Sequence, residues 1–370
     1  MNNVDSDAFE RLADALNKLP NGFPRTQSNV EIEMLRKIFS EEEASLASQL
    51  TGTFEPVGEI AERLGFKQDE IKPRLIQMAK RGLVRMSRKT AKMTFRLAPF
   101  IVGIYEDHLY SMDHEFAHLF EEYMESGGAA GIMKPQPALH RVVPARGAVK
   151  SEWIMPYDDI KAMLEKAKSF RARDCICRVQ QDLLGKRTCD FPVKMCVTFS
   201  PVQRPSHPND ISKEEAIALL DRAEKIGLVH CVSNVIKDVF YICNCCSCCC
   251  AILRGITDWG IEESVARANY YANIDSEVCD SCGVCVARCQ VKALENMNGD
   301  FLVHHEKCIG CGLCVTGCPN GAVILERRTD AELVEPPEDF EAWEKMRSQR
   351  RGIRTGSMSG AQYDDKTMGH

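Results

Sequence analysis

The sequence lacks several features that commonly reveal a protein's class. No stretch approaches the roughly 20 apolar residues that a membrane-spanning helix needs. The first residues, MNNVDSDAFERLADAL, have no basic start followed by an apolar stretch, as a secretory signal would. There is no GxGxxG after a strand, no GxxxxGK followed by Ser or Thr, and no Ser-His-Asp constellation. We therefore expect a cytoplasmic protein with neither a dinucleotide fold nor an ATPase site.

Cysteine is also missing from most of the chain, because none of the 19 occurs before Cys175 or after Cys318. Inside that window they form four groups, at 175–196, 231–250, 279–289 and 308–318. The reducing cytoplasm disfavours disulfides. Local clustering of thiols in such a compartment indicates metal binding. The net charge of −6 does not suit a general polyanion binder.

The last two groups repeat one motif. CDSCGVCVARC and CIGCGLCVTGCP both read C-x2-C-x2-C-x3-C, and each cysteine of the first recurs 29 positions later. Three thiolates on one loop can bind one cubane, while the fourth reaches the other cluster. Two zinc knuckles do not require this spacing twice. The pattern predicts two [4Fe–4S] clusters, one held by Cys279, Cys282, Cys285 and Cys318 and the other by Cys308, Cys311, Cys314 and Cys289.

These motifs resemble the bacterial two-cluster ferredoxin domain over about residues 273–326. Gln290 departs from that pattern, because many such domains have Pro at this point. The order CxCR, helix, CNCC-x-CCC and double ferredoxin motif is similar to an uncharacterised family of long dicluster ferredoxin-like proteins. That resemblance implies an N-terminal winged-helix-like domain and no established reaction.

The middle region carries thiols in a less familiar pattern. A C-x-C-x11-C-x6-C segment is followed by a helix at 212–227, with Ser212 and Glu215 as a capping box and Gly227 as its stop. Arg178 should lower the pKa of nearby thiols. We expect one or two further iron–sulfur clusters, or alternatively a structural zinc, bound by some of Cys175, Cys177, Cys189, Cys196, Cys243, Cys245, Cys246, Cys248, Cys249 and Cys250.

Side chains alternate along an extended segment, so Cys243 and Cys245 should face one way and Cys246 and Cys248 another. Cys231 is interpreted as a small buried residue.

The N-terminal half predicts a winged helix. Residues 56–98 read as helix, turn at Gly65, helix and a two-stranded wing with 85–90 near its tip, and they carry a net charge of +7. DNA binding is possible, with the second helix in the major groove. However, Pro73 should delay or kink that helix, and we find no base-reading side chains. Docking on a protein is favoured over DNA binding.

The expected fold class is a multidomain α+β protein. Its parts are a helical and winged-helix-like domain (1–100), a helical and extended connector (101–156), a Cys-rich α/β middle domain (157–272), the two-cluster ferredoxin-like domain (273–326) and a polar tail (327–370). The tail should hold a short helix near Trp343 and then be disordered. His114 and His118 share a helix face but lack an HExxH motif and are interpreted as surface residues.

Three functions are consistent with this pattern. The first is an electron-transfer protein serving a partner oxidoreductase, since the clusters lack any accompanying substrate motif. The second is a reductase with a substrate-reducing cluster in the middle domain. The third is a redox-responsive transcription regulator, which would need fewer clusters than the cysteines provide. We rank them in that order and assign no catalytic residue.

Overall fold

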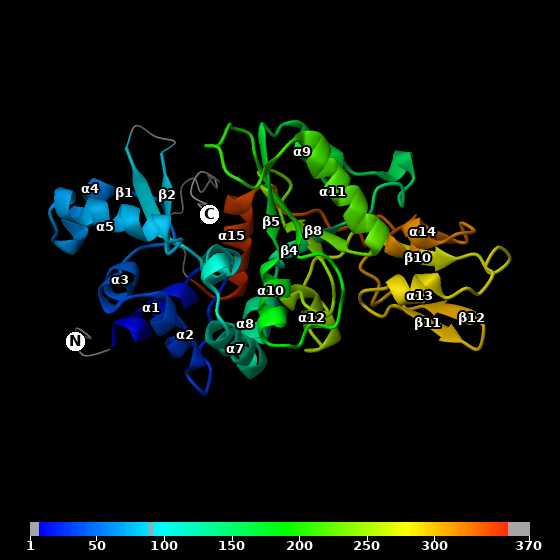
Figure 1. Cartoon of the computed structure of the whole chain (residues 1–370), viewed down its shortest axis with the longest axis horizontal. Helices are drawn as coiled ribbons and strands as arrows, with labels where there is room; N and C mark the ends of the chain where they lie inside the picture. Colours follow the sequence, from blue (N-terminus) through cyan, green and yellow to red (C-terminus); the bar gives the residue numbers. More distant parts are fainter. Residues whose placement is uncertain (1–6, 89–91, 354–370) are drawn as a thin grey trace. The chain divides into compact units, whose positions relative to one another are not determined.

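The computed structural model describes residues 7–88 and 92–353. The chain divides into two compact units, which we describe separately. The first contains Met1–Gln136, Leu183–Gly185 and Asp339–His370, and the second contains Pro137–Asp182 and Lys186–Glu338 (Figure 1). No helix among the described residues is long and apolar enough to cross a membrane.

The first unit is mainly helical. Its core is aromatic: Tyr105 and Phe120 stack with ring centroids 3.9 Å apart, and Phe100 contacts Phe23. Asp113 caps α7 by accepting a hydrogen bond from the Phe116 N–H. The helices outside the basic segment are α1 (Ala8–Asn17), α2 (Val30–Ile38), α3 (Glu41–Ala47), α6 (Tyr105–Asp107), α7 (His114–Tyr123) and α8 (Ala129–Met133).

The basic segment has helices α4 (Val57–Leu64) and α5 (Gln68–Lys80), followed by the hairpin β2 (Val84–Ser87) and β3 (Thr94–Leu97). The short strand β1 (Glu55–Pro56) completes a three-stranded sheet in the order β1-β3-β2. The order of elements is the expected one, and the assignment as a winged helix stays a prediction.

Two details of that expectation are wrong. Pro73 does not delay α5, which starts at Gln68 and continues through it. Arg85 does not lie near the hairpin tip: it lies within β2 and is buried against Asp107. Residues 89 and 90 of the expected tip lie outside the described residues.

The C-terminal segment contributes helix α15 (Phe340–Arg350) to this same unit. Phe340 and Trp343 are buried, and Arg347 is fully buried, with its Nε donating to the Pro20 carbonyl at 2.9 Å. Glu344 pairs with Arg96 at 3.2 Å. The helix expected near Trp343 is therefore a packed element of the N-terminal unit. The disorder expected further along falls on 354–370, outside the described residues.

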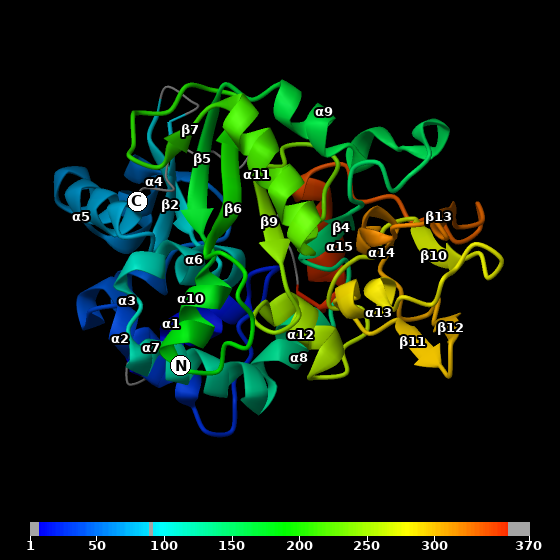
Figure 2. The ribbon, with the colours of Figure 1, turned by 45° about the vertical axis from the view of Figure 1, so that its right-hand side comes forward.

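The second unit is built on a six-stranded antiparallel sheet in the order β4-β8-β9-β6-β5-β7. Figure 2 shows helix α11 lying across it in front of β6 and β9. The sheet extends into the segment expected as a connector, because β4 is its edge strand. The strands are β4 (His140–Val143), β5 (Ser169–Asp174), β6 (Lys194–Ser200), β7 (Asp210–Ile211), β8 (Val229–Ser233) and β9 (Tyr241–Cys245).

Helix α11 (Lys213–Ile226) begins and ends as the sequence predicts. Ser212 and Glu215 form a capping box, and Gly227 ends the helix in the left-handed conformation with φ of 97°. The helix packs Ala216 and Leu220 against Val197, Val232 and Ile242 of the sheet. One face of the sheet is therefore aliphatic. The remaining helices of this part are α9 (Ile160–Glu165), α10 (Ile176–Leu183) and α12 (Ala251–Thr257).

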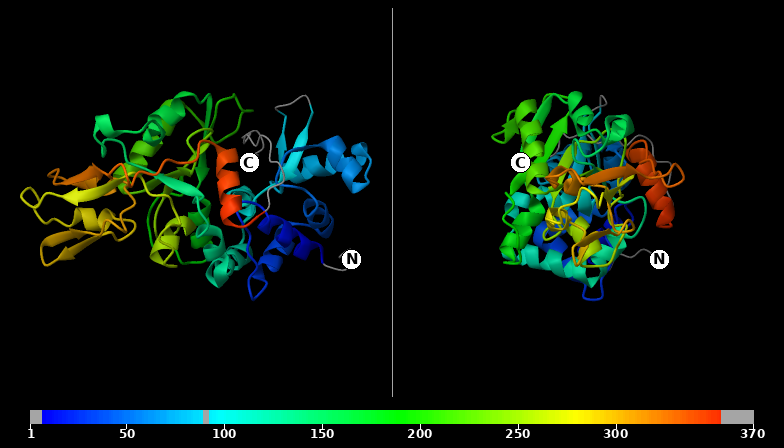
Figure 3. Two further views of the ribbon diagram at one scale, coloured as in Figure 1. Left: turned by 180° about the vertical axis from the view of Figure 1, so that it is seen from behind. Right: turned by 90° about the vertical axis from the view of Figure 1, so that its right-hand side faces the viewer.

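The C-terminal part of the second unit has two short helices and two two-stranded sheets (Figure 3). The outer strands pair antiparallel, from Tyr270 with Arg327 to Ile274 with Val323. The elements are β10 (Tyr270–Ile274), α13 (Val284–Arg288), β11 (Leu294–Met297), β12 (Asp300–Val303), α14 (Leu313–Gly317) and β13 (Val323–Arg327).

Candidate metal centres

The C-terminal cysteine loops repeat in structure as they do in sequence. Gly283 and Gly312 precede α13 and α14 in the left-handed conformation, with φ of 75° and 73°. A residue with a side chain would be strained there, so glycine is needed at both positions. Cys289 and Cys318 follow the two helices with φ of −76° in each case. Both motifs therefore present their thiols from the same local framework.

The fold brings the fourth thiol of one motif to the other motif. Cys289 interacts electrostatically with Cys308, Cys311 and Cys314. Cys285 interacts with Cys279 and Cys282 of its own loop. Cys314 also interacts with Cys285, but Cys289 is the thiol of the first motif that interacts with all three of these thiols in the second.

Backbone amides surround these sulfurs. The Ala293 N–H donates to the Cys289 Sγ at 3.1 Å, and the Ala272 N–H donates to the Cys308 Sγ at 3.4 Å. Burial raises the pKa of the Cys318 thiol, but hydrogen bonds from nearby amides, including that of Val323, outweigh it and lower the pKa. Donors directed at sulfur stabilise thiolate ligands, so these residues fit iron–sulfur clusters.

The two thiol sets differ in exposure. Cys282 is exposed, and the chain around it, residues 275–283, is largely exposed as well. Cys308 and Cys314 are buried, and burial raises the pKa of the Cys311 thiol. The only exposed thiol of the eight is therefore Cys282 of the first motif, whereas the second motif has two buried thiols.

Comparison with known families agrees with this geometry. Residues 271–329 match the 4Fe-4S dicluster domain. The match confirms the expected ferredoxin-like domain, and it implies an iron–sulfur redox role and two [4Fe–4S] clusters. No curated protein and no solved structure matches the chain.

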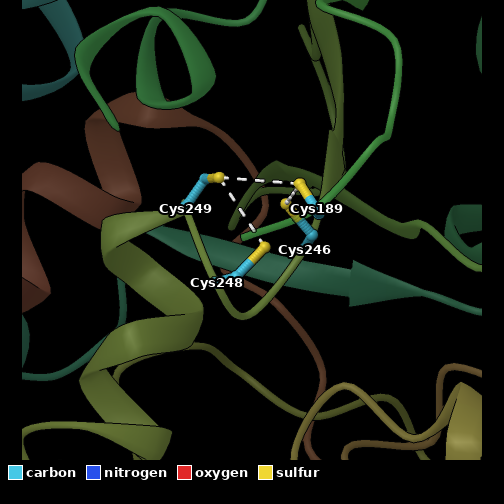
Figure 4. Close-up of side chains that lie close together, drawn as sticks. All are labelled: Cys189, Cys246, Cys248 and Cys249. Carbon is cyan, nitrogen blue, oxygen red and sulfur yellow. Dashed lines mark hydrogen bonds between the residues drawn. The ribbon is translucent and has the colours of Figure 1, made fainter. Parts of the chain in front are cut away.

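Outside the dicluster domain, four thiols form a compact group (Figure 4). The sulfurs of Cys189, Cys246, Cys248 and Cys249 all lie within 4.8 Å of one another. Cys189 comes from the loop between α10 and β6, and the other three come from the turn between β9 and α12. Cys189 lies 4.0 Å from Cys246 and 3.8 Å from Cys249, and Cys248 lies 3.6 Å from Cys249. We call this group the four-thiol site.

These separations indicate the kind of metal. A tetrahedral ion with metal–sulfur bonds of about 2.3 Å has ligand sulfurs about 3.8 Å apart. The four-thiol site matches that edge length, so it suits one ion. Hydrogen bonds from Cys248 and Cys249, together with Arg178, lower the pKa of the Cys246 thiol. A thiolate is therefore favoured at the centre of the group.

Arg178, singled out in the sequence, is fully buried beside these thiols. Its Nη2 donates to the Asn244 carbonyl at 2.9 Å and lies 3.5 Å from the Cys246 Sγ. It also interacts electrostatically with Cys175 and Cys196. Its Nε has no hydrogen-bond partner within the part of the chain that the structure covers. A buried N–H donor without a partner, beside a group of thiols, fits a site that binds a further hydrogen-bond acceptor.

The four thiols of the C-x-C-x11-C-x6-C segment, Cys175, Cys177, Cys189 and Cys196, do not form one group. Cys189 belongs to the four-thiol site, while the other three hydrogen-bond within a separate set. The expected alternation in CNCCSCCC holds, since Cys243 and Cys245 join that separate set and Cys246 and Cys248 join the four-thiol site. Cys250 also joins the separate set.

The dicluster domain packs against the middle domain, on the end of α11 and the chain that follows β4. The Ala145 N–H donates to the Cys311 carbonyl at 2.9 Å. Arg288 of α13 donates to the carbonyls of Leu313, Lys225 and Glu224 at 2.7, 3.0 and 2.7 Å. The two parts therefore form one body rather than two linked modules.

Sequence reasoning missed two contributors. Gln290, noted only as a departure from the ferredoxin pattern, binds Ser247 inside the four-thiol loop. Cys231 is buried as expected, yet it hydrogen-bonds Cys245 and interacts electrostatically with Cys311. Neither contact has a local sequence pattern. The departure of Gln290 from the ferredoxin pattern was the one feature of the sequence that could have pointed to either of them.

Proposed function

We propose that the protein is an iron–sulfur electron-transfer protein that passes electrons between a donor and a partner oxidoreductase. When bound, the clusters supply reversible one-electron chemistry. The observation that carries the proposal is the placement of the two motifs: Cys282 is exposed, whereas the Cys311 carbonyl accepts from the Ala145 N–H just after β4, and the Cys311 thiol interacts electrostatically with buried Cys231. One set thus offers a surface for a redox partner, and the other leads inward.

The ligand sets we propose are Cys279, Cys282, Cys285 and Cys318 for one cluster, and Cys289, Cys308, Cys311 and Cys314 for the other. The interactions of Cys289 with the thiols of the second motif support this crossed arrangement. We also propose that the four-thiol site holds a single zinc ion. Its sulfur spacing and its closed set of four thiols are typical of structural zinc.

The first unit is proposed to dock on a protein rather than to regulate transcription. Four of its basic side chains are already paired with carboxylates: Arg63 with Glu55, Arg81 with Glu43, Arg85 with Asp107 and Arg96 with Glu344. The net positive charge of the segment is therefore partly neutralised within the unit. Duplex DNA should bind weakly and lose affinity steeply with added salt. A sequence-specific footprint at physiological salt would favour the regulator instead.

The experiment for the electron-transfer role uses the full-length protein, reconstituted without oxygen and reduced with dithionite. After removal of the reductant, it is mixed rapidly with oxidised cytochrome c. We expect at least about two electrons per chain to be delivered, one for each cubane. Electron paramagnetic resonance should show both cluster signals disappearing.

A protein that reduces no cytochrome c would contradict the proposal. If it were instead oxidised by a small-molecule substrate with product formation, the reductase alternative would replace it. The resemblance to long dicluster ferredoxin-like proteins, carried by CxCR and CNCC-x-CCC, agrees with either role.

A further inference from the structure

The face of the middle sheet opposite α11 carries a row of thiols. Cys231 of β8 lies directly opposite Cys243 of β9 in the antiparallel register. Val197 of β6 lies opposite Ile242 of β9. Because these strands are antiparallel, the preceding residue of β6, Cys196, lies opposite the following residue of β9, Cys243. Directly opposed residues present their side chains on the same face of a sheet. Three adjacent strands therefore each contribute a thiol to one face, while Ile242 faces α11.

Six thiols on this side form a closed ring in which each thiol lies close enough to interact with the next. They come from β6, from β9, from the junction of β5 with the start of α10, and from the N-cap of α12. The successive pairs are Cys175 with Cys177, Cys177 with Cys250, Cys250 with Cys245, Cys245 with Cys243, Cys243 with Cys196, and Cys196 with Cys175. We call this set the six-thiol ring.

The ring is too large for a single ion. In a six-membered ring, opposite members are separated by about twice the distance between adjacent members. A single tetrahedral ion with bonds of about 2.3 Å instead needs all of its ligand sulfurs to be adjacent to one another. It is also buried: Cys175, Cys245 and Cys250 are each less than 9% exposed. Thiols are weak hydrogen-bonding groups, so such a ring offers little stability to a core by itself.

We propose that the six-thiol ring is a second metal centre of the middle domain, binding an iron–sulfur cluster separate from the ion of the four-thiol site. The assignment of an iron–sulfur cluster rests on the proposed electron-transfer function. The position of the centre rests on the arrangement of the thiols alone. A cluster of several irons has the size that a ring of thiolates can enclose.

Charge and neighbours support this assignment. Arg178 interacts electrostatically with Cys175 and Cys196 of the ring and with Cys246 of the four-thiol site. A buried guanidinium offsets part of the negative charge that thiolate ligands bring. Cys231 hydrogen-bonds the ring at Cys245 and interacts with Cys311 of the dicluster domain. The ring therefore adjoins the buried ligand set of that domain.

The test measures iron, sulfide and zinc per chain in full-length protein prepared without oxygen. One variant, Cys196→Ser with Cys243→Ser, removes two ring thiols. A second, Cys189→Ser with Cys249→Ser, removes two thiols of the four-thiol site. A third combines them, and Ser233→Ala controls for a change at a buried position on the same face of β8.

The ring variant should lose about a third of the iron, four of about twelve ions, and keep its zinc. The four-thiol variant should lose its zinc and keep its iron, and the combined variant should show both losses. The Ser233→Ala control should keep both metals. Retained paramagnetic signals of the dicluster domain, which packs against the middle domain, report that each variant is folded.

Unchanged iron in the ring variant would overturn the proposal, as would a combined variant that loses no more metal than either pair alone. Loss of zinc rather than iron from the ring variant would also overturn it. The single substitution Cys177→Ala repeats the ring test if the double variant fails to fold. None of these results decides the delivery of electrons to cytochrome c, so failure of the ring and failure of the proposed function are distinguishable.

Discussion

The side-chain amide of Gln290 holds the backbone of Ser247. Its Oε1 accepts from the Ser247 N–H at 2.9 Å and from the Ser247 hydroxyl at 3.1 Å, while its Nε2 donates to the Gly227 carbonyl at 3.0 Å. Ser247 lies between Cys246 and Cys248 of the four-thiol site, and Gln290 directly follows Cys289. One side chain thus connects a ligand loop of the dicluster domain to a ligand loop of the middle sheet.

Replacing Gln290 with Leu should weaken the four-thiol site without removing a ligand. The substitution keeps the size of the side chain but leaves the Ser247 N–H unpaired. Loss of such a supporting contact typically lowers metal affinity about 10–100-fold. Competition with a chelator should therefore remove zinc more easily from Gln290→Leu than from the parent protein.

The matched control is Gln77→Leu, an exposed position on α5 of the other unit. Its zinc affinity should equal that of the parent. Equal zinc affinity in Gln290→Leu as well would show that the contact with Ser247 has no influence on the site.

Replacing Arg178 with Gln should reduce metal content at both middle-domain sites. The guanidinium interacts with Cys246 on one side and with Cys175 and Cys196 on the other. Breaking a buried charge pair typically costs about 3–5 kcal/mol, because the remaining charge is left uncompensated. Metal analysis should show combined loss of zinc and iron, and Arg178→Lys should retain more of both because it keeps the charge.

Arg222→Gln on the exposed side of α11 serves as the comparison and should leave the metal content unchanged. If Arg178→Gln affects the zinc alone, the guanidinium does not serve the six-thiol ring.

The crossed ligand sets predict which variants behave alike. Cys289→Ser should remove the same cluster as Cys308→Ser, and Cys318→Ser the same cluster as Cys282→Ser. The cluster left in Cys318→Ser has no exposed thiol, whereas the one left in Cys289→Ser includes exposed Cys282, so the absorbance of Cys318→Ser should decay more slowly in air. If Cys289→Ser instead had the same spectra and decay rate as Cys282→Ser, each motif would bind its cluster with its own fourth thiol.

Asp158 should make folding of the second unit depend on pH. Burial raises the pKa of its carboxyl group from 3.8 to about 6, although Arg141 at 3.3 Å opposes the shift. The folded state then binds the proton more tightly than the unfolded chain. This stabilisation is complete below about pH 4 and is lost as the pH rises to about 6.

The measurement compares Asp158→Asn with the parent in anaerobic unfolding experiments. Between pH 5 and pH 6, the parent should lose about 1 kcal/mol of unfolding free energy relative to the variant. Parallel pH profiles for the two proteins would show that Asp158 does not titrate in this window.

Local sequence determined the repeated features of this protein. The C-x2-C-x2-C-x3-C spacing sets thiols on one short loop, so the dicluster domain was predictable from the motif alone. The capping box at Ser212 and the stop at Gly227 likewise act within one helix, and both were predicted. The opposite orientation of Cys243 and Cys246 follows from the alternation of an extended chain.

Only the tertiary structure decided how the middle thiols are divided and what adjoins them. Cys189 joins Cys249, and Cys175 joins Cys196, because the sheet register and the loop after α10 bring distant segments together. The electrostatic interaction of Cys231 with Cys311 and the hydrogen bond of Gln290 with Ser247 depend on the packing of the dicluster domain against the middle domain. Such contacts leave no periodic pattern in the sequence, since the free energy that selects them comes from packing between segments far apart along the chain.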